Sequence, residues 1–169
     1  MAATFTLISS VTVGSGGAAN MEFTSIPATY TDLVVKISQR ADGTNSYPNM
    51  RFNNTSSNYS IRYLYGNGST TSSSTGNTTY FELLGAEGPT QTSNTFTNQE
   101  IYIPNYASSN YKSISVDTVS ENNATFAETA FVAGLWSDTA AITSILLRPT
   151  GATNFVQYST AYLYGISNA

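Results

Sequence analysis

Short segments in which apolar and polar residues alternate recur along most of the chain, and they constrain the fold more than any other feature of the sequence. A period of two places successive side chains on opposite faces of a strand, and no stretch stands out with the period of an amphipathic helix. Turn-forming residues, chiefly Gly, Asn, Ser and Asp, separate these segments. The segments that this pattern predicts to be strands are residues 5–13, 33–40, 61–65, 80–84, 100–103 and 113–119. In the first of them, Phe5, Leu7, Val11 and Val13 are expected to share one face.

Two later segments carry apolar residues on both faces. In residues 126–136, Phe131 and Leu135 are expected to oppose Val132 and Trp136; in residues 142–147, Ile142 and Leu146 oppose Ile145 and Leu147. Strands that are apolar on both faces are covered on both sides, so a subunit partner could provide the second cover. A long loop or a central position in the fold explains the pattern equally well. The candidate interface residues are Ile142, Leu146 and Trp136.

Two polar stretches interrupt the strands. Residues 66–79 are rich in Ser, Thr, Asn and Gly, which predicts an exposed flexible loop, and a second polar stretch covers residues 88–98. About ten short strands with such turns predict an all-β fold, a single antiparallel β-sandwich domain over residues 1–169. A jelly roll is the favoured wiring, and periodicity leaves immunoglobulin-like connectivity open.

The composition excludes several kinds of chemistry. Because His and Cys are both absent, Ser-His and Cys-His nucleophiles and the usual zinc and iron ligand sets are excluded. No apolar run approaches 18 residues, so no membrane span is expected. The net charge is −4 and the six cationic residues are scattered, whereas nucleic-acid binding needs a basic patch. We therefore predict no metal site, no cofactor, no nucleic-acid partner and no enzymatic activity.

Paired carboxylates are the remaining route to catalysis. Asp117 and Glu121 lie on one face of a predicted strand, but four residues of strand separate them by about 13 Å. Glycosidases need carboxylates about 5.5 Å apart, or less than about 10 Å for inversion. A cross-strand pair such as Glu82 with Glu128 depends on the fold, and solvated surface acids are the favoured interpretation.

Among the remaining side chains that could bind a ligand, aromatic and amide groups are the most numerous. Tyr gives rigid amphipathic contact area and Asn gives adaptable hydrogen bonds, a combination that suits recognition of proteins or sugars. Tyr is also a good strand residue with a hydroxyl at the edge of a core, which is the favoured interpretation of any single tyrosine. Pro104 predicts the end of a strand, beyond which Tyr106 could be presented at a surface or could equally pack beneath a loop. The candidate binding residues, all in or beside predicted loops, are Tyr47, Asn49, Asn58, Tyr59, Asn105, Tyr106, Asn110 and Tyr111.

Several of these motifs, in this order along nearly the whole chain, resemble a family of virion structural proteins of tailed phages. They are residues 5–13 (FTLISSVTV), 23–27 (FTSIP), 30–33 (YTDL), 51–53 (RFN), 58–60 (NYS), 103–106 (IPNY), Trp136, 141–143 (AIT) and 162–166 (YLYGI). The family is common in cyanophages and other marine and freshwater phages, and its members are described as virion structural or tail-fibre-like.

This resemblance implies a particle-surface location and carries no catalytic residues. A tail fibre generally needs an attachment region and a shaft before its tip, and a chain that is rich in strands from Phe5 onward leaves no room for either. We therefore expect a capsid decoration or cement protein, a homotrimer that binds the major capsid protein or other virion proteins through many weak contacts. The alternative is a tail or tail-fibre adsorption module that binds host glycan.

Overall fold

The computed structural model describes residues 4–44, 46–76, 79–85, 87–123, 127–151 and 153–167, and these residues form antiparallel strands without a helix. The expected all-β class is therefore confirmed. Twelve strands lie in the described part of the chain: β1 (Thr4–Thr12), β2 (Met21–Phe23), β3 (Asp32–Gln39), β4 (Pro48–Phe52), β5 (Tyr59–Gly66), β6 (Thr71–Thr75), β7 (Phe81–Glu82), β8 (Thr97–Ile103), β9 (Lys112–Ser120), β10 (Glu128–Trp136), β11 (Ile145–Pro149) and β12 (Thr160–Ser167).

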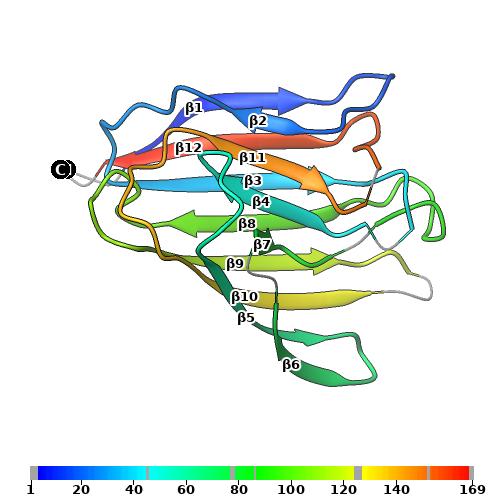
Figure 1. Cartoon of the computed structure of the whole chain (residues 1–169). Coiled ribbons are helices and arrows are strands. Elements are labelled where there is room, and N and C mark those ends of the chain that lie inside the picture. Colours follow the sequence, from blue (N-terminus) through cyan, green and yellow to red (C-terminus); the bar gives the residue numbers. More distant parts are fainter. Residues whose placement is uncertain are drawn as a thin grey trace.

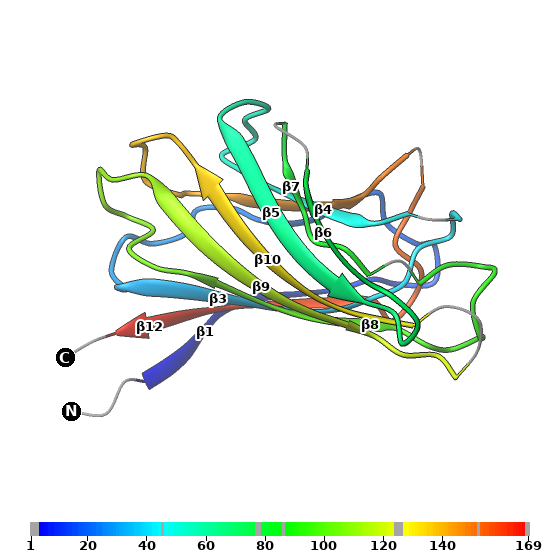
Figure 2. The same cartoon turned by 90° about the horizontal axis from the view of Figure 1, so that it is seen from below.

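The strands form two sheets that pack face to face in a β-sandwich-like arrangement (Figure 1). The large sheet has the order β1-β12-β3-β8-β9-β10-β5-β6, and the small sheet has the order β2-β11-β4-β7. Seen from below, β5 and β6 curl toward β7 at one edge of the sandwich (Figure 2). Jelly-roll wiring is not confirmed by this strand order, in which β8, β9 and β10 follow one another as a meander.

Alternation along each strand divides the large sheet into an inner and an outer face. In β8, β9 and β10 every second residue is buried against the small sheet, and the residues between them are exposed. Aromatic rings fill the middle of the interior: the ring centroids of Phe52 and Trp136 lie 5.6 Å apart, and those of Tyr59 and Phe81 lie 4.9 Å apart. These edge-on contacts join the two sheets.

A bulge in β1 changes the predicted face of its apolar residues. Register shifts between Leu7 and Ser9, so Phe5 and Leu7 lie exposed on the outer face, whereas Val11 turns inward opposite Ala161. The prediction that these residues share one face was wrong, because one extra residue in a strand inverts the alternation beyond it.

The predicted loop over residues 66–79 is also partly wrong. Thr71–Thr75 forms β6, an exposed edge strand paired with β5 from Gly66↔Thr71 to Arg62↔Thr75. The Asn67 side chain accepts hydrogen bonds from the backbone N–H groups of Ser69 and Thr70 and stabilises the turn between the two strands. Backbone pairing needs no buried side chain, so a polar segment can extend a sheet at its edge. Asn77 and Thr78 lie outside the described residues.

Two of the three candidate interface residues belong to the interior. Trp136 and Ile142 are buried in the core between the sheets, so neither is available to a subunit partner. Leu146 is half-buried in β11, opposite Glu22 and Arg51. The expected two-sided character of residues 126–136 is correct for the described part: Val132 and Trp136 face inward, and Phe131 and Leu135 face outward (Phe126 lies outside the described residues).

Candidate functional site

Three of the candidate binding residues lie in the interior. The Tyr59 hydroxyl accepts a hydrogen bond from the backbone N–H of Phe52 at 2.8 Å, and the Tyr106 hydroxyl donates to the carbonyl of Pro27. Asn49 is also buried. A ligand at the surface cannot reach these side chains, and burial raises the pKa of both tyrosines. Tyr59 and Tyr106 are therefore structural residues, as in the favoured interpretation of a tyrosine as a core residue whose hydroxyl finds a partner at the edge of the core.

The other candidates are accessible but do not share one environment. Asn58 and Asn105 are exposed and have positive φ angles of 70° and 51°, a backbone conformation that Asn tolerates in turns. Asn110 and Tyr111 are exposed in the loop before β9. Tyr47 is half-buried and lines a cavity between the sheets.

Large apolar side chains gather on the outer face of the large sheet. Phe131 of β10 is directly opposite Leu64 of β5, and these side chains are 59% and 54% exposed. Leu135 of β10 continues the row, and an apolar hollow of about 640 Å³ lies beside Phe131 and Leu64. Contiguous exposed apolar side chains, such as the opposed Phe131 and Leu64, are typical of binding surfaces. We name Leu64, Phe131 and Leu135 the apolar patch.

The neighbouring part of the same face carries charged and polar side chains beside Val119 and Phe131. Glu100 of β8 is directly opposite Asp117 of β9, and both acids line a groove of about 410 Å³ that also contains Lys36 and Tyr102. Like charges at opposite positions destabilise a sheet. The Lys36 ammonium lies 2.7 Å from Glu100, and this hydrogen bond raises the pKa of the lysine.

A cavity of about 340 Å³ lies where β5 and β6 curl toward β7. Tyr63 and Tyr65 of β5, Glu82 of β7 and Glu128 of β10 line it together with Tyr47; Asn67 and Leu84 complete the lining. The spacing of Tyr63 and Tyr65 places both rings on the inner face of one strand, with centroids 6.2 Å apart. We name this cavity the carboxylate pocket.

Burial raises the pKa of both carboxylates in this pocket. For Glu82, desolvation is the cause. For Glu128, desolvation is the largest cause, the N–H of Gly85 opposes it with a hydrogen bond of 2.5 Å, and the charges of Glu82 and Glu87 add to it. Tyr47 has a raised pKa, first from burial and then from the charges of the two pocket acids. Two acids with raised pKa values in one cavity are typical of functional sites, although structural networks also produce them.

The question that the sequence left open for Glu82 and Glu128 thus has an answer: they come from different sheets and share one pocket. Asp117 and Glu121 instead lie exposed at and beyond β9. Tyr63 and Tyr65 were missed as candidates because only the fold places them together with Glu82 and Glu128. The alternation of Tyr63 with Tyr65 was the one usable signal in the sequence.

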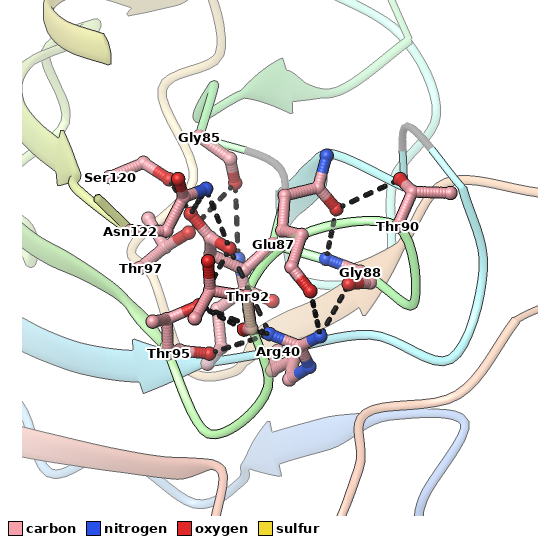
Figure 3. Close-up of polar contacts among 12 residues, drawn as sticks. Arg40, Gly85, Glu87, Gly88, Thr90, Thr92, Thr95, Thr97, Ser120 and Asn122 are labelled. Atoms are coloured by element: carbon pink, nitrogen blue, oxygen red, sulfur yellow. Dashed lines mark hydrogen bonds and ion pairs between the residues drawn. The ribbon is translucent and has the colours of Figure 1, made fainter. Parts of the chain in front are cut away.

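A buried polar cluster holds the segment that follows β7 (Figure 3). The Arg40 guanidinium donates to the carbonyls of Gly88, Gln91, Thr92 and Thr95. Glu87 lies 3.8 Å from Arg40 and accepts hydrogen bonds from Ser120, Asn122 and Thr95. This cluster fixes the chain on which Leu84 and Gly85 approach the carboxylate pocket.

The described residues contain neither a group of three or more acidic side chains placed to hold a metal ion nor a helix that could cross a membrane. Comparisons with models of protein families, with curated proteins and with solved structures find no match for this chain.

Proposed function

We propose that this chain is a non-enzymatic structural protein of a phage virion, a decoration or cement protein that binds the outer capsid surface and stabilises it. The resemblance of its motifs to phage structural proteins supports the virion context. The observation that carries the binding role is the apolar patch, whose three side chains are 36–59% exposed on the outer face of a sheet. The docked partner is the major capsid protein, and a homotrimer would repeat the same contact by symmetry.

A sheet face suits this role because its side chains are held by the backbone pairing beneath them. Phe131 lies on β10, which pairs along its length with both β9 and β5. Little conformational entropy is then lost when the patch docks, so several modest apolar contacts suffice when the lattice repeats them. The polar groove beside the patch would form the rim of such an interface.

The test is the rebinding of purified protein to particles that lack it. Phe131→Ser should fold normally, since exposed substitutions change stability by about 0.5 kcal/mol or less, and should lose particle binding. Tyr111→Ser is the matched control, because Tyr111 is also 59% exposed but lies in the loop before β9. Full binding by Phe131→Ser would refute the proposed docking face. Absence of the protein from purified particles, measured by quantitative mass spectrometry against the major capsid protein, would refute the virion proposal.

The polar groove favours a second candidate function, a tail or tail-fibre adsorption module that binds host glycan. Tyr102 and the exposed amide and carboxylate groups of Asn98, Glu100 and Asp117 lie in one open groove, and sugars are bound by aromatic faces together with such polar groups. Under this proposal Tyr102→Ala abolishes saturable binding on a glycan array, and the particle carries only a few dozen copies or fewer. No sugar affinity above background would exclude it.

A further inference from the structure

The carboxylate pocket contains two carboxyl groups, and no described residue that lines it carries a positive charge. Glu82 is half-buried, and no described residue gives its carboxylate a hydrogen bond or an ion pair. Glu128 is only 8% exposed; its Oε1 accepts the N–H of Gly85, and its Oε2 receives no hydrogen bond from the described residues. Buried carboxylates are normally paired, so this arrangement is costly unless something else occupies the pocket.

Most cations of the chain are engaged elsewhere. Lys36 pairs with Glu100 on the outer face, and Arg40 is held in the buried polar cluster. Lys112 is buried and donates to three backbone carbonyls at the other end of β10. Arg51 lies over the ring of Tyr80, and the Arg62 guanidinium bonds the carbonyl of Ile61. The described residues that line the pocket include no Lys or Arg, so the lining itself supplies no positive group for the two acids.

The tyrosines complete a site for such a group. Tyr63 and Tyr65 come from the same face of β5, with ring planes inclined by 40°, and Tyr47 lines the same cavity with the two acids. An ammonium gains from the negative face of aromatic rings and from charge-assisted hydrogen bonds to carboxylates. Asn67 is exposed at the mouth of the pocket, where its side chain is bonded to the β5–β6 turn.

We propose that the carboxylate pocket binds an organic ammonium group through Glu82 and Glu128, with Tyr47, Tyr63 and Tyr65 around it. The ammonium belongs either to a free amine or to a lysine side chain of a partner protein. This site is on the inner side of the sandwich edge, separate from the apolar patch, and the inference stands without the proposed virion function.

Charge and ligand count favour this occupant over two others. A neutral sugar would leave the two carboxylates without a compensating positive charge. Calcium prefers six to eight oxygen ligands, and Mg²⁺ demands octahedral geometry. The lining of this pocket offers two carboxylates and one amide, of which Glu128 Oε1 and Asn67 Oδ1 already accept backbone N–H groups. Its other oxygens are neutral phenols, which are not among the usual ligands of either ion. An ammonium needs only a few acceptors and uses the rings as well.

The experiment is an NMR titration of the isotope-labelled full chain with n-butylammonium, with Nα-acetyl-lysine methylamide and with neutral n-butanol. We expect saturable shifts of Tyr63 and Tyr65 with the two ammonium probes, at a dissociation constant on the order of 1 mM, and none with butanol. Glu82→Gln and Glu128→Gln should each weaken binding by about tenfold or more. Glu100→Gln, on the outer face, is the matched control and should leave the affinity within about twofold.

The pH dependence of ammonium affinity is an independent test of the two carboxylates. Both carboxylates must be ionised to bind the cation, so affinity should fall as the pH is lowered through their raised pKa values. If Nα-acetyl-lysine methylamide binds more tightly than n-butylammonium, the ammonium comes from a protein side chain. Equal dissociation constants for the two probes would identify a free amine as the ligand. No ammonium shift up to about 50 mM, tight Ca²⁺ binding in its place, or unchanged affinity in both Gln variants would overturn the proposal.

Discussion

Replacing Arg40 by Met tests whether the buried polar cluster holds the sandwich together. The Arg40 side chain is 11% exposed, and its guanidinium bonds four backbone carbonyls between Gly88 and Thr95 at distances up to 3.2 Å. The Glu87 side chain beside it is fully buried. Methionine fills a similar volume but donates no hydrogen bond, so the carbonyls and the carboxylate lose their common partner.

The expected cost follows from burial. Removing one member of a buried charged pair costs about 3–5 kcal/mol, because the remaining charge and its acceptors stay away from water. For a chain of this size, each 1 kcal/mol lowers the midpoint of thermal unfolding by about 2–4 °C, so the midpoint should fall by about 6–20 °C. The segment from Glu87 to Thr95 should also lose its hydrogen-exchange protection.

Urea unfolding measures the free-energy cost and thermal unfolding measures the shift of the midpoint. Lys36→Met is the matched control in both assays. Lys36 and Glu100 form a shorter ion pair, at 2.7 Å, but their side chains are 50% and 53% exposed. Exposed pairs contribute about 0–1 kcal/mol, so Lys36→Met should change the free energy of unfolding little. If Arg40→Met lowered the free energy of unfolding no more than Lys36→Met does, burial of the Arg40 cluster would not contribute to stability as argued.

Three further predictions concern stability. Gly165→Ala places a Cβ 2.3 Å from the ring of Tyr30 and should cost about 1–3 kcal/mol in urea unfolding, whereas Gly14→Ala, with no atom within 4 Å, should be neutral. Lys112→Met leaves three backbone carbonyls without their donor and should cost about 1–3 kcal/mol by the same assay. Burial raises the pKa of Glu82 above 4.5, so its contribution to stability is present below that value and lost as the pH rises through the raised pKa. Glu82→Gln should therefore raise the thermal midpoint near neutral pH and not at about pH 3, and equal gains at both pH values would contradict desolvation of the carboxylate as the cause.

Periodicity predicted the strands in which buried and exposed side chains alternate. The predicted strand over residues 113–119 corresponds to β9, which alternates buried and exposed residues throughout. The edge strand β6 was missed because its pairing with β5 involves backbone groups and leaves its side chains exposed. The bulge at Leu7 was missed because register is set by the partner strand β12, which lies at the other end of the sequence.

Loop position proved a poor guide to accessible tyrosines. Tyr59 begins β5, and Tyr106 follows the strand end that Pro104 correctly predicted, but both rings turn into the core and satisfy their hydroxyls on backbone groups nearby. The accessible aromatic Phe131 stands in the middle of a strand instead. Whether an aromatic residue near a turn faces water depends on what packs over it, and the sequence does not record that.

The interior of the sandwich is apolar at one end and polar at the other. We assign stabilisation of the fold to the apolar end and ligand binding to the polar end. Around Trp136, rings from both sheets pack together and stabilise the fold. Toward Glu128, the inward-facing residues of β8 and β9 are Gln99 and Thr118, which donate hydrogen bonds to the carbonyls of the segment after β7. A well-packed apolar end would be at least as stable as this network. We therefore attribute the polar end to the pocket that it positions. If Glu82→Gln and Glu128→Gln both stabilise the chain while weakening ammonium binding about tenfold or more, stability has been exchanged for a binding site at this end of the sandwich.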